Sequence, residues 1–510
     1  MLSKTRVISF LFAALFTIPS MAVSDQELRP KLIVGIAVDQ MRWDYLCRFY
    51  NEYTSGGFRR MLSEGYSFDD CQINYIPSVT AVGHTSVYTG SVPAIHGIAG
   101  NNFFIDEKII YCTSDSTVKT VGSNTDAGKM SPHNLLTTTI GDELKTATNW
   151  KSKVIGVSFK DRAAILPAGH SADAAYWFDK KGLRFVSSTY YMQSLPSWVD
   201  DYNKEIAEEV KKMKPVEVGS HKLTKQIDLV QYSPYGNLIV EEMAKRAIAG
   251  ERLGQRGETD MICISFSCTD IVGHAFGTHA DITHEMYMEL DKQLADMFNY
   301  LDQTIGKGEY VAFLTADHGA SNGILQNQEH KIPADGFLLD REEDGVNKYL
   351  ASKYAGRGGI VKCIMDYKVV IDRKAAAGLD FKTLKQDIME YFRQRPLVSN
   401  VVDLEDISAA SVPTYIREKI YNGYCNGRSG DIQLILKPAV YGVRGKIDEG
   451  TTHGCWNPYD CHIPFVLMGW GVPHGSLAEE VHITDIAPTV CNLVHIQMPS
   501  GCIGMPREMK

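Results

Sequence analysis

Leu32-Ile-Val-Gly-Ile-Ala-Val-Asp39 is an uninterrupted apolar run that ends on a carboxylate. A strand that is apolar at every position is typical of a parallel sheet covered by helices on both faces. The carboxyl ends of such strands open into the crevice where α/β proteins bind ligands. The run therefore predicts an α/β fold and places Asp39 at the crevice.

Two further apolar runs repeat this arrangement of a strand followed by polar side chains. Residues 261–266 precede Asp270, and residues 310–315 precede Asp317 and His318. Because parallel strands end at the same edge of a sheet, we expect the three strand ends to converge. Between them, residues 282–305 have the apolar spacing of a helix. We expect a layered α/β fold whose central sheet is mainly parallel and sandwiched by helices.

Six potential metal ligands lie in these segments and in one late motif. The ligands are Asp39, Asp270 and His274 of Asp-Ile-Val-Gly-His, Asp317 and His318 of Ala-Asp-His-Gly, and His453 of Thr-His-Gly. Carboxylate and imidazole together suit zinc, and six ligands divide into two sites of three. With 15 histidines and 61 acidic residues in the chain, any single cluster could arise by chance. Their joint placement after strands and beside glycines favours a two-metal hydrolase.

The segment at residues 74–90 is predicted to be a loop that turns into a helix. Pro77 and Ser78 are start signals, so Thr80 is expected in or near the first turn, where backbone N–H groups attract anions. A threonine hydroxyl becomes a useful nucleophile when a divalent metal lowers its pKa. Without the metal-ligand clusters, the favoured interpretation of Thr80 alone would be a helix cap. We expect His84 to be a hydrogen-bonded helix residue rather than a metal ligand.

These residues and motifs resemble the alkaline phosphatase superfamily, and within it the phosphodiesterase/nucleotide pyrophosphatase-like branch that includes the PafA-type periplasmic alkaline phosphatases. The similarity covers most of the chain. It implies an alkaline-phosphatase-like fold with Thr80 as nucleophile. It also implies one zinc bound by Asp270, His274 and His453, and a second bound by Asp39, Asp317 and His318 together with Thr80.

Two more stretches bear on the subtype. The resemblance implies that Asn101 contacts the phosphate, with Asn102 as the other candidate, and that Lys160 and Arg162 hold the phosphoryl oxygens. Diesterase relatives generally lack the lysine and arginine pair. A monoester arrives as a dianion and needs more positive charge than a diester does. The alternative is that residues 160–162 form a solvated turn after the strand predicted at 154–158.

The expected function is that of a two-zinc alkaline phosphatase that hydrolyses phosphate monoesters through a phosphothreonine intermediate. A phosphodiesterase or nucleotide pyrophosphatase on the same scaffold is the first alternative. A sulfatase is disfavoured because the nucleophile segment has no cysteine. An inactive zinc-binding surface protein is the alternative of another class, but it would be expected to have lost a ligand or the nucleophile.

The first 22 residues have the basic start, apolar core and small-residue end of a secretory signal peptide. We therefore expect an exported, periplasmic protein whose catalytic domain spans residues 23–510. No later stretch has the apolar length to span a bilayer. The formal net charge is -9, and removal of the basic signal peptide makes it more negative, which argues against nucleic acid as a partner. Small phosphate monoesters are the expected partners.

Two long inserts, at about residues 170–250 and 340–440, are expected to cap the crevice or form a subdomain. The first contains the aromatic run at residues 176–178. Eleven cysteines in an exported protein permit disulfides, and the local candidates are Cys263 with Cys268 and Cys455 with Cys461. A cysteine metal site is disfavoured because no C-x-x-C spacing occurs.

Overall fold

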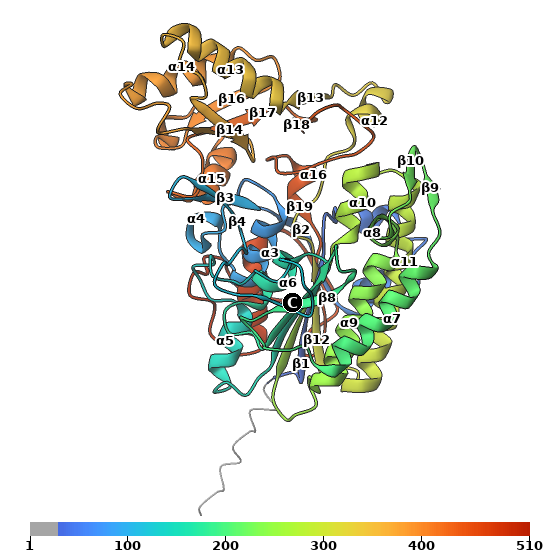
Figure 1. The fold of residues 1–510 in the computed structure, drawn as a ribbon. Helices are drawn as coiled ribbons and strands as arrows, with labels where there is room; N and C mark the ends of the chain where they lie inside the picture. Colours follow the sequence, from blue (N-terminus) through green and yellow to red (C-terminus); the bar gives the residue numbers. More distant parts are fainter. Residues whose placement is uncertain (1–28) are drawn as a thin grey trace, which may run out of the picture.

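The computed structural model describes residues 29–510, which form a layered α/β body and a smaller unit above it (Figure 1). An eleven-stranded sheet runs through the body. Its strand order is β19 (His462–Ile463), β2 (Tyr66–Gln72), β20 (Phe465–Gly469), β12 (Tyr310–Thr315), β1 (Leu32–Val38), β11 (Asp260–Phe266), β6 (Val154–Ser158), β7 (Ala174–Asp179), β8 (Arg184–Ser188) and β5 (Thr120–Val121), with β21 (Gly475–His482) beside β2.

The five central strands, from β12 to β7, are parallel to one another, whereas β20 and β8 flank them in antiparallel orientation. Every residue of β1, β11 and β12 is buried, as their apolar runs predicted. Val38 pairs with Phe266, and Ala37 pairs with Thr315, so the three strands end at the same level. The predicted α/β class with a mainly parallel central sheet is confirmed.

Helices cover both faces of this sheet (Figure 1). One face carries α7 (Ser197–Lys212), α9 (Tyr235–Glu251) and α11 (Asp281–Leu301), and the other carries α3 (Thr80–Thr89), α5 (Ile140–Ala147), α6 (Asp161–Ala168) and α17 (Ile486–Leu493). Helix α11 buries the apolar stripe that its sequence predicted: Met286, Leu290, Leu294, Met297 and Leu301. All ten residues of α3 are buried, which holds its first turn firmly against the sheet.

Shorter elements connect these layers. They are α1 (Asp44–Arg48), α2 (Phe58–Glu64), α4 (Pro93–His96), β3 (Asn102–Ile105), β4 (Lys108–Tyr111), α8 (Gln226–Gln231), α10 (Cys268–Phe276), α12 (Ile324–Glu329), α15 (Thr414–Gly423) and α16 (Pro458–Cys461). Within residues 29–510, no helix combines the length and the apolar character that crossing a membrane requires. The expected signal peptide lies outside the described residues.

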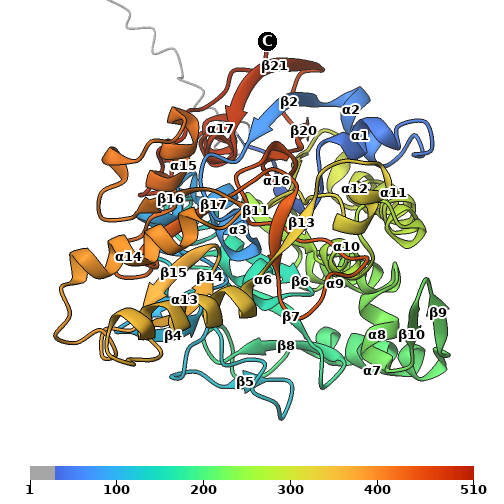
Figure 2. The same cartoon turned by 90° about the horizontal axis from the view of Figure 1, so that it is seen from above.

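Residues 170–250 do not form the expected cap. Strands β7 and β8 extend the central sheet, and α7 and α9 belong to the layer that covers it. All six residues of β7 are buried, including Trp177, so the aromatic run belongs to the core. Only the hairpin of β9 (Val216–Val218) and β10 (His221–Leu223) projects from the helical side of the body (Figure 2).

The smaller unit has a core of its own. Its sheet has the order β14 (Val361–Met365), β15 (Lys368–Ile371), β17 (Ile432–Leu436) and β16 (Val398–Asp403), and it packs against α13 (Leu339–Lys353) and α14 (Phe381–Arg393). A parallel pair, β13 (Asp335–Leu338) with β18 (Val440–Val443), links it to the body. The turn between β14 and β15 reaches the body, where the Tyr367 hydroxyl lies 3.4 Å from the His453 carbonyl.

The expected disulfides are absent, and all eleven cysteines are free. Cys263 in β11 contacts Tyr88 of α3, whereas Cys268 lies against Gly236 of α9. These two helices cover opposite faces of the sheet, so the two thiols point apart. Cys455 and Cys461 also stay unbonded, because the Cys455 sulfur is directed at the carbonyl of Val440 in β18.

Candidate metal centre and active site

Three buried carboxylates meet at the carboxyl end of the parallel strands. Asp39 directly follows β1, Asp317 follows β12, and Asp270 lies in the first turn of α10 just after β11. Their exposed fractions are 0%, 0% and 3%. The strand ends therefore converge as their sequences predicted, and they bring three buried carboxylates together.

The first group of potential metal ligands comprises Asp39, Asp317 and His318, whose ligand atoms lie within 4.8 Å of one another. His318 Nε2 is 3.5 Å from Asp39 Oδ1 and 3.3 Å from Asp317 Oδ2. Both oxygens are buried. Asp39 Oδ1 has no hydrogen-bond partner within residues 29–510, and Asp317 Oδ2 has His84 Nδ1 at 3.1 Å. Buried carboxylate oxygens need a cation or a donor. The unpartnered Asp39 Oδ1 fits a bound metal ion.

The second group comprises Asp270, His318 and His453, again within 4.8 Å. Asp270 Oδ1 lies 3.6 Å from His453 Nε2 and 3.1 Å from His274 Nε2. His274 is therefore at the outer edge of this group, with 39% of its side chain exposed. His318, which the sequence assigned to one site, faces both groups, and its ring stacks on that of His453 at 3.5 Å.

The three imidazoles share one orientation. In each, Nδ1 donates a hydrogen bond to a backbone carbonyl, and Nε2 is the nitrogen that faces the carboxylates. The acceptors are Thr451 O for His274 (2.9 Å), Gly319 O for His318 (2.9 Å) and Ser78 O for His453 (2.7 Å). A carbonyl that fixes the other ring nitrogen is the usual support of a metal-bound histidine. The donor set thus fits a pair of divalent metal ions.

Gln40 and His84 support the carboxylates, and sequence reasoning gave neither this role. Gln40 donates from Nε2 to Asp270 Oδ1 (2.6 Å) and from its backbone to Asp317 Oδ1 (3.2 Å). His84 lies 3.1 Å from Asp317 Oδ2 and also bonds the Thr80 carbonyl, as expected of a hydrogen-bonded helix residue. A glutamine after a strand carries no specific signal, because its two partners are distant in the sequence.

Thr80 is the first residue of α3 and is 1% exposed. Its Oγ1 lies 3.4 Å from His318 Nε2, beside both groups of ligands. In the same turn, the Ala81 backbone donates to Asn101 Oδ1 at 2.9 Å. Asn102 is exposed and begins β3. Asn101, rather than Asn102, is therefore the asparagine at the helix start.

Lys160 and Arg162 lie at the N-terminal end of α6. Lys160 is 8% exposed, and its Nζ lies 2.5 Å from Asp39 Oδ2 and 2.6 Å from Asp270 Oδ2. Arg162 donates to the Tyr111 hydroxyl at 3.0 Å, while its buried Nε has no partner in the described part of the chain. The solvated turn is ruled out for Lys160. Tyr111, which sequence reasoning missed, orients the guanidinium.

Burial and neighbouring charges shift the pKa values of the site residues in different directions. Burial raises the pKa of Asp39, and the charge of Asp317 adds to that effect. Burial also acts on Asp270, but His274 and Lys160 outweigh it and hold the pKa of Asp270 well below its ordinary value. Burial, followed by the two other imidazoles, lowers the pKa of His453. His453 is therefore neutral near pH 7, which is the protonation state that binds metal.

Comparison with known proteins places the chain in a family. The family described as type I phosphodiesterase / nucleotide pyrophosphatase matches residues 33–457. Alkaline phosphatase PhoV of Synechococcus elongatus is 45% identical over 93% of this chain and 92% of its own length. Alkaline phosphatase PafA of Elizabethkingia meningoseptica is 43% identical over 94% of both.

The fold agrees with this relationship. The crystal structure of wild-type alkaline phosphatase PafA superimposes with a TM-score of 0.88 at 42% sequence identity, covering 94% of this chain and 98% of that one. The chain belongs to the type I phosphodiesterase / nucleotide pyrophosphatase family of the alkaline phosphatase superfamily, among its PafA-type members.

Proposed function

We propose that this protein is a two-zinc alkaline phosphatase that hydrolyses phosphate monoesters through a phosphothreonine intermediate. The main observation behind the proposal is the position of the Thr80 hydroxyl. It lies at the start of α3, 3.4 Å from Nε2 of His318, which belongs to both groups of potential metal ligands. Relatives above 40% identity that bear the name alkaline phosphatase support it.

We assign the ligands in two sets. Asp39, Asp317 and His318, with Thr80, hold one zinc, and Asp270, His274 and His453 hold the other. The three imidazoles that turn Nε2 toward the carboxylates and the unpartnered Asp39 Oδ1 support this assignment. When bound, a pair of zinc ions supplies Lewis acidity toward the nucleophile and the leaving oxygen.

The hydroxyl of Thr80 performs the covalent step. Its Oγ1 loses its proton and forms a bond to phosphorus while the bond from phosphorus to the leaving oxygen breaks, and that oxygen takes up a proton to leave as the alcohol. Water then attacks the phosphothreonine, the bond from Oγ1 to phosphorus breaks, a proton of the water restores the Thr80 hydroxyl, and inorganic phosphate leaves. The N-terminus of α3 stabilises the anionic group during both steps through the positive end of the helix dipole, although the Ala81 N–H of this turn is taken by Asn101 Oδ1.

Three side chains are suited to hold the non-bridging oxygens. Asn101 accepts from Ala81 through Oδ1, so its amide nitrogen remains as a donor toward the helix start. Lys160 lies between Asp39 and Asp270, and thus between the two proposed zinc sites. Arg162 has an unused buried Nε. Two cations beyond the metals favour a dianionic monoester over a monoanionic diester, which supports the monoesterase.

We also propose export to the periplasm, on the pattern of residues 1–22. N-terminal sequencing of the protein recovered from the producing cells tests this. A mature chain that begins at or near residue 23 is expected, whereas an intact Met1 would contradict export through this segment.

Initial rates of the zinc-loaded protein on matched aryl phosphate monoester, diester and sulfate test the proposed activity. We expect the highest kcat/KM on the monoester. A higher kcat/KM on the diester would favour the nucleotide pyrophosphatase alternative. Zinc binding without hydrolysis of any substrate would favour the inactive zinc-binding protein.

A further inference from the structure

A second cavity begins where the proposed phosphate clamp ends. It has a volume of about 450 Å³ and is lined by Lys160 and Arg162 on one side and by Lys180 and Lys181, which follow β7, on the other. This volume is within the usual range for small-ligand sites, about 300–1,000 Å³. Since Lys160 and Arg162 belong to both places, this cavity adjoins a phosphoryl group held by the clamp.

Two of the cations that line the cavity have no acidic partner. Within residues 29–510, Lys160 pairs with Asp39 and Asp270, whereas Lys180 and Lys181 of the same lining form no ion pair. Lys180 instead donates to the neutral amide oxygen of Gln231 at 3.0 Å, and its Nζ lies 5.5 Å from the ring centroid of Phe159. Burial, together with the positive charges of Lys160 and Arg162, lowers the pKa of Lys180. An anion bound in this cavity would reduce the electrostatic repulsion among these cations.

The carboxylates around the same cavity are already engaged elsewhere. Asp161 accepts from the Tyr111 hydroxyl, Asp179 accepts from the hydroxyls of Ser123 and Thr125, and Asp126 pairs with Lys129. Each of these anionic groups therefore has its own donor. The hydroxyl donors hold these carboxylates in place without removing their charge, so four cations and three carboxylates leave the lining of the cavity with a small excess of positive charge.

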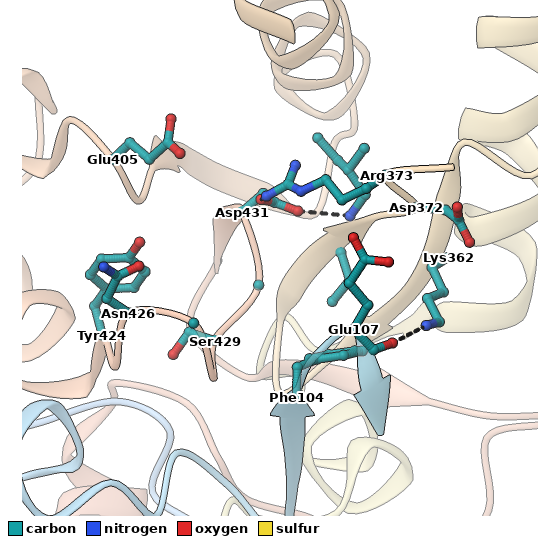
Figure 3. A pocket seen from close by; sticks show the side chains of 14 residues that line it. Phe104, Glu107, Lys362, Asp372, Arg373, Glu405, Tyr424, Asn426, Ser429 and Asp431 are labelled. Atoms are coloured by element: carbon teal, nitrogen blue, oxygen red, sulfur yellow. Dashed lines mark hydrogen bonds and ion pairs between the residues drawn. The ribbon is translucent and has the colours of Figure 1, made fainter. Parts of the chain in front are cut away.

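The cavity drawn in Figure 3 shows the opposite case. There, Arg373 pairs with Asp431, Lys362 donates to the carbonyl of Glu107, and Asp372 binds two backbone N–H groups of its own turn. Its lining holds two cations and four carboxylates, whereas the lining of the cavity beside Arg162 holds four cations and three carboxylates. The balance of charge therefore favours an anion in the cavity beside Arg162.

We propose that the cavity beside Arg162 binds a second anionic group, a carboxylate or a phosphate, on the leaving-group side of the substrate. The preferred substrates are then phosphate monoesters whose alcohol part carries a further negative charge. This inference rests on the proposed phosphatase activity. Phe159, Trp177 and Phe178 form the apolar floor of the cavity, which suits a carbon skeleton between the two anionic groups.

The test uses two aryl phosphates that differ only in charge, 4-carboxyphenyl phosphate and 4-carbamoylphenyl phosphate. The measured quantity is the ratio of kcat/KM for the carboxylate substrate to that for the amide substrate. The double variant Lys180→Ala, Lys181→Ala is expected to lower this ratio about fivefold, mainly through KM, as for two solvent-exposed ion pairs. Lys180→Arg with Lys181→Arg should retain most of the wild-type ratio, and added salt should lower it in wild type.

Lys211→Ala with Lys212→Ala is the matched control, because it removes two adjacent exposed lysines at the end of α7, each paired with a glutamate. It should leave the ratio near that of wild type. An unchanged ratio in the Lys180 and Lys181 variant, or an equal fall in the control, would overturn the subsite. A wild-type enzyme that hydrolysed neither substrate would instead overturn the proposed phosphatase activity.

Discussion

Thr80 is the residue on which the proposed covalent route depends. Thr80→Ala should lower kcat by a thousandfold or more, on the order seen when a nucleophile is removed. Zinc content should stay close to that of wild type, because six other ligands remain. Steady-state kinetics with metal analysis measures both. Thr80→Ser retains a hydroxyl and should keep part of the activity, while full activity of Thr80→Ala would contradict the phosphothreonine.

Lys160 and Arg162 should determine the preference for monoesters. Two charge-assisted contacts contribute about 1.5–3 kcal/mol each, so changing both residues to alanine should lower monoester kcat/KM about a hundred- to ten-thousandfold, allowing for non-additivity. Diester hydrolysis should fall less, since a second ester group replaces one charged oxygen. The same kinetics on both substrates measures the shift. Equal losses would show that the pair does not select monoesters.

The contact between α3 and the residues that follow β12 sets the distance between Thr80 and the metal ligand Asp317. Gly83 packs so closely that a methyl group in its place would lie 2.0 Å from the Asp317 carbonyl oxygen. Alanine favours a helix over glycine by about 1 kcal/mol. Overpacking costs about 1–3 kcal/mol, so the steric clash is expected to outweigh the gain in helix propensity.

Gly83→Ala should therefore lower both the free energy of unfolding and kcat/KM, because Thr80 and Asp317 are pushed apart. Denaturant unfolding and steady-state kinetics are the measurements. Gly358→Ala is the control, since no atom lies within 4 Å of the added methyl group. If Gly83→Ala matched the stability and activity of wild type, the close contact would not govern the site.

Metal removal should affect the whole molecule. The two ligand groups draw on β1, β11 and β12 and on the loop of His453, so bound metal stabilises only the folded arrangement. We expect about two zinc ions per chain by elemental analysis. Chelation should abolish activity reversibly and lower Tm, measured by calorimetry. Full activity in a preparation free of divalent metal would rule out the proposed mechanism.

Stability should also depend on pH through Asp460, a buried residue whose Oδ2 accepts from the Cys455 backbone. Burial raises the pKa of Asp460 from 3.8 to about 8, against the charges of Arg42 and Lys419. The folded chain keeps this proton up to about pH 8, whereas the unfolded chain releases it near pH 4. Protonated Asp460 therefore contributes fully to the free energy of unfolding at low pH. This contribution is lost as pH rises from about 4 to about 8.

Asp460→Asn should flatten that dependence, because asparagine can accept the same hydrogen bond and does not titrate. Denaturant unfolding at intervals from pH 5 to about pH 8 compares the two slopes. Parallel slopes in wild type and Asp460→Asn would show that Asp460 is ionised in the folded protein.

Local sequence was enough to predict several parts of this protein. Residues 32–38 are apolar throughout, and residues 261–266 and 310–315 are apolar apart from Ser265 and Thr315. A strand buried on both faces needs no more than that pattern. Thr80 was expected at a helix start because Pro77 and Ser78 precede it. The convergence of the carboxylates was predicted because each follows a strand, and the carboxyl ends of parallel strands lie at the same edge of a sheet.

Other features depend on contacts between distant segments, and only the tertiary structure decided them. Residues 170–250 resembled an insert because nothing local distinguishes a strand in the sheet from one in a cap. Cys263 and Cys268 are close in sequence but face opposite layers. Gln40 meets its partners more than two hundred residues away, and Lys160 meets Asp39 and Asp270 from a third strand. The local sequence shows which carboxylates and imidazoles follow strands. Which of them contact one another depends on the order of the strands in the sheet, and the local sequence does not give that order.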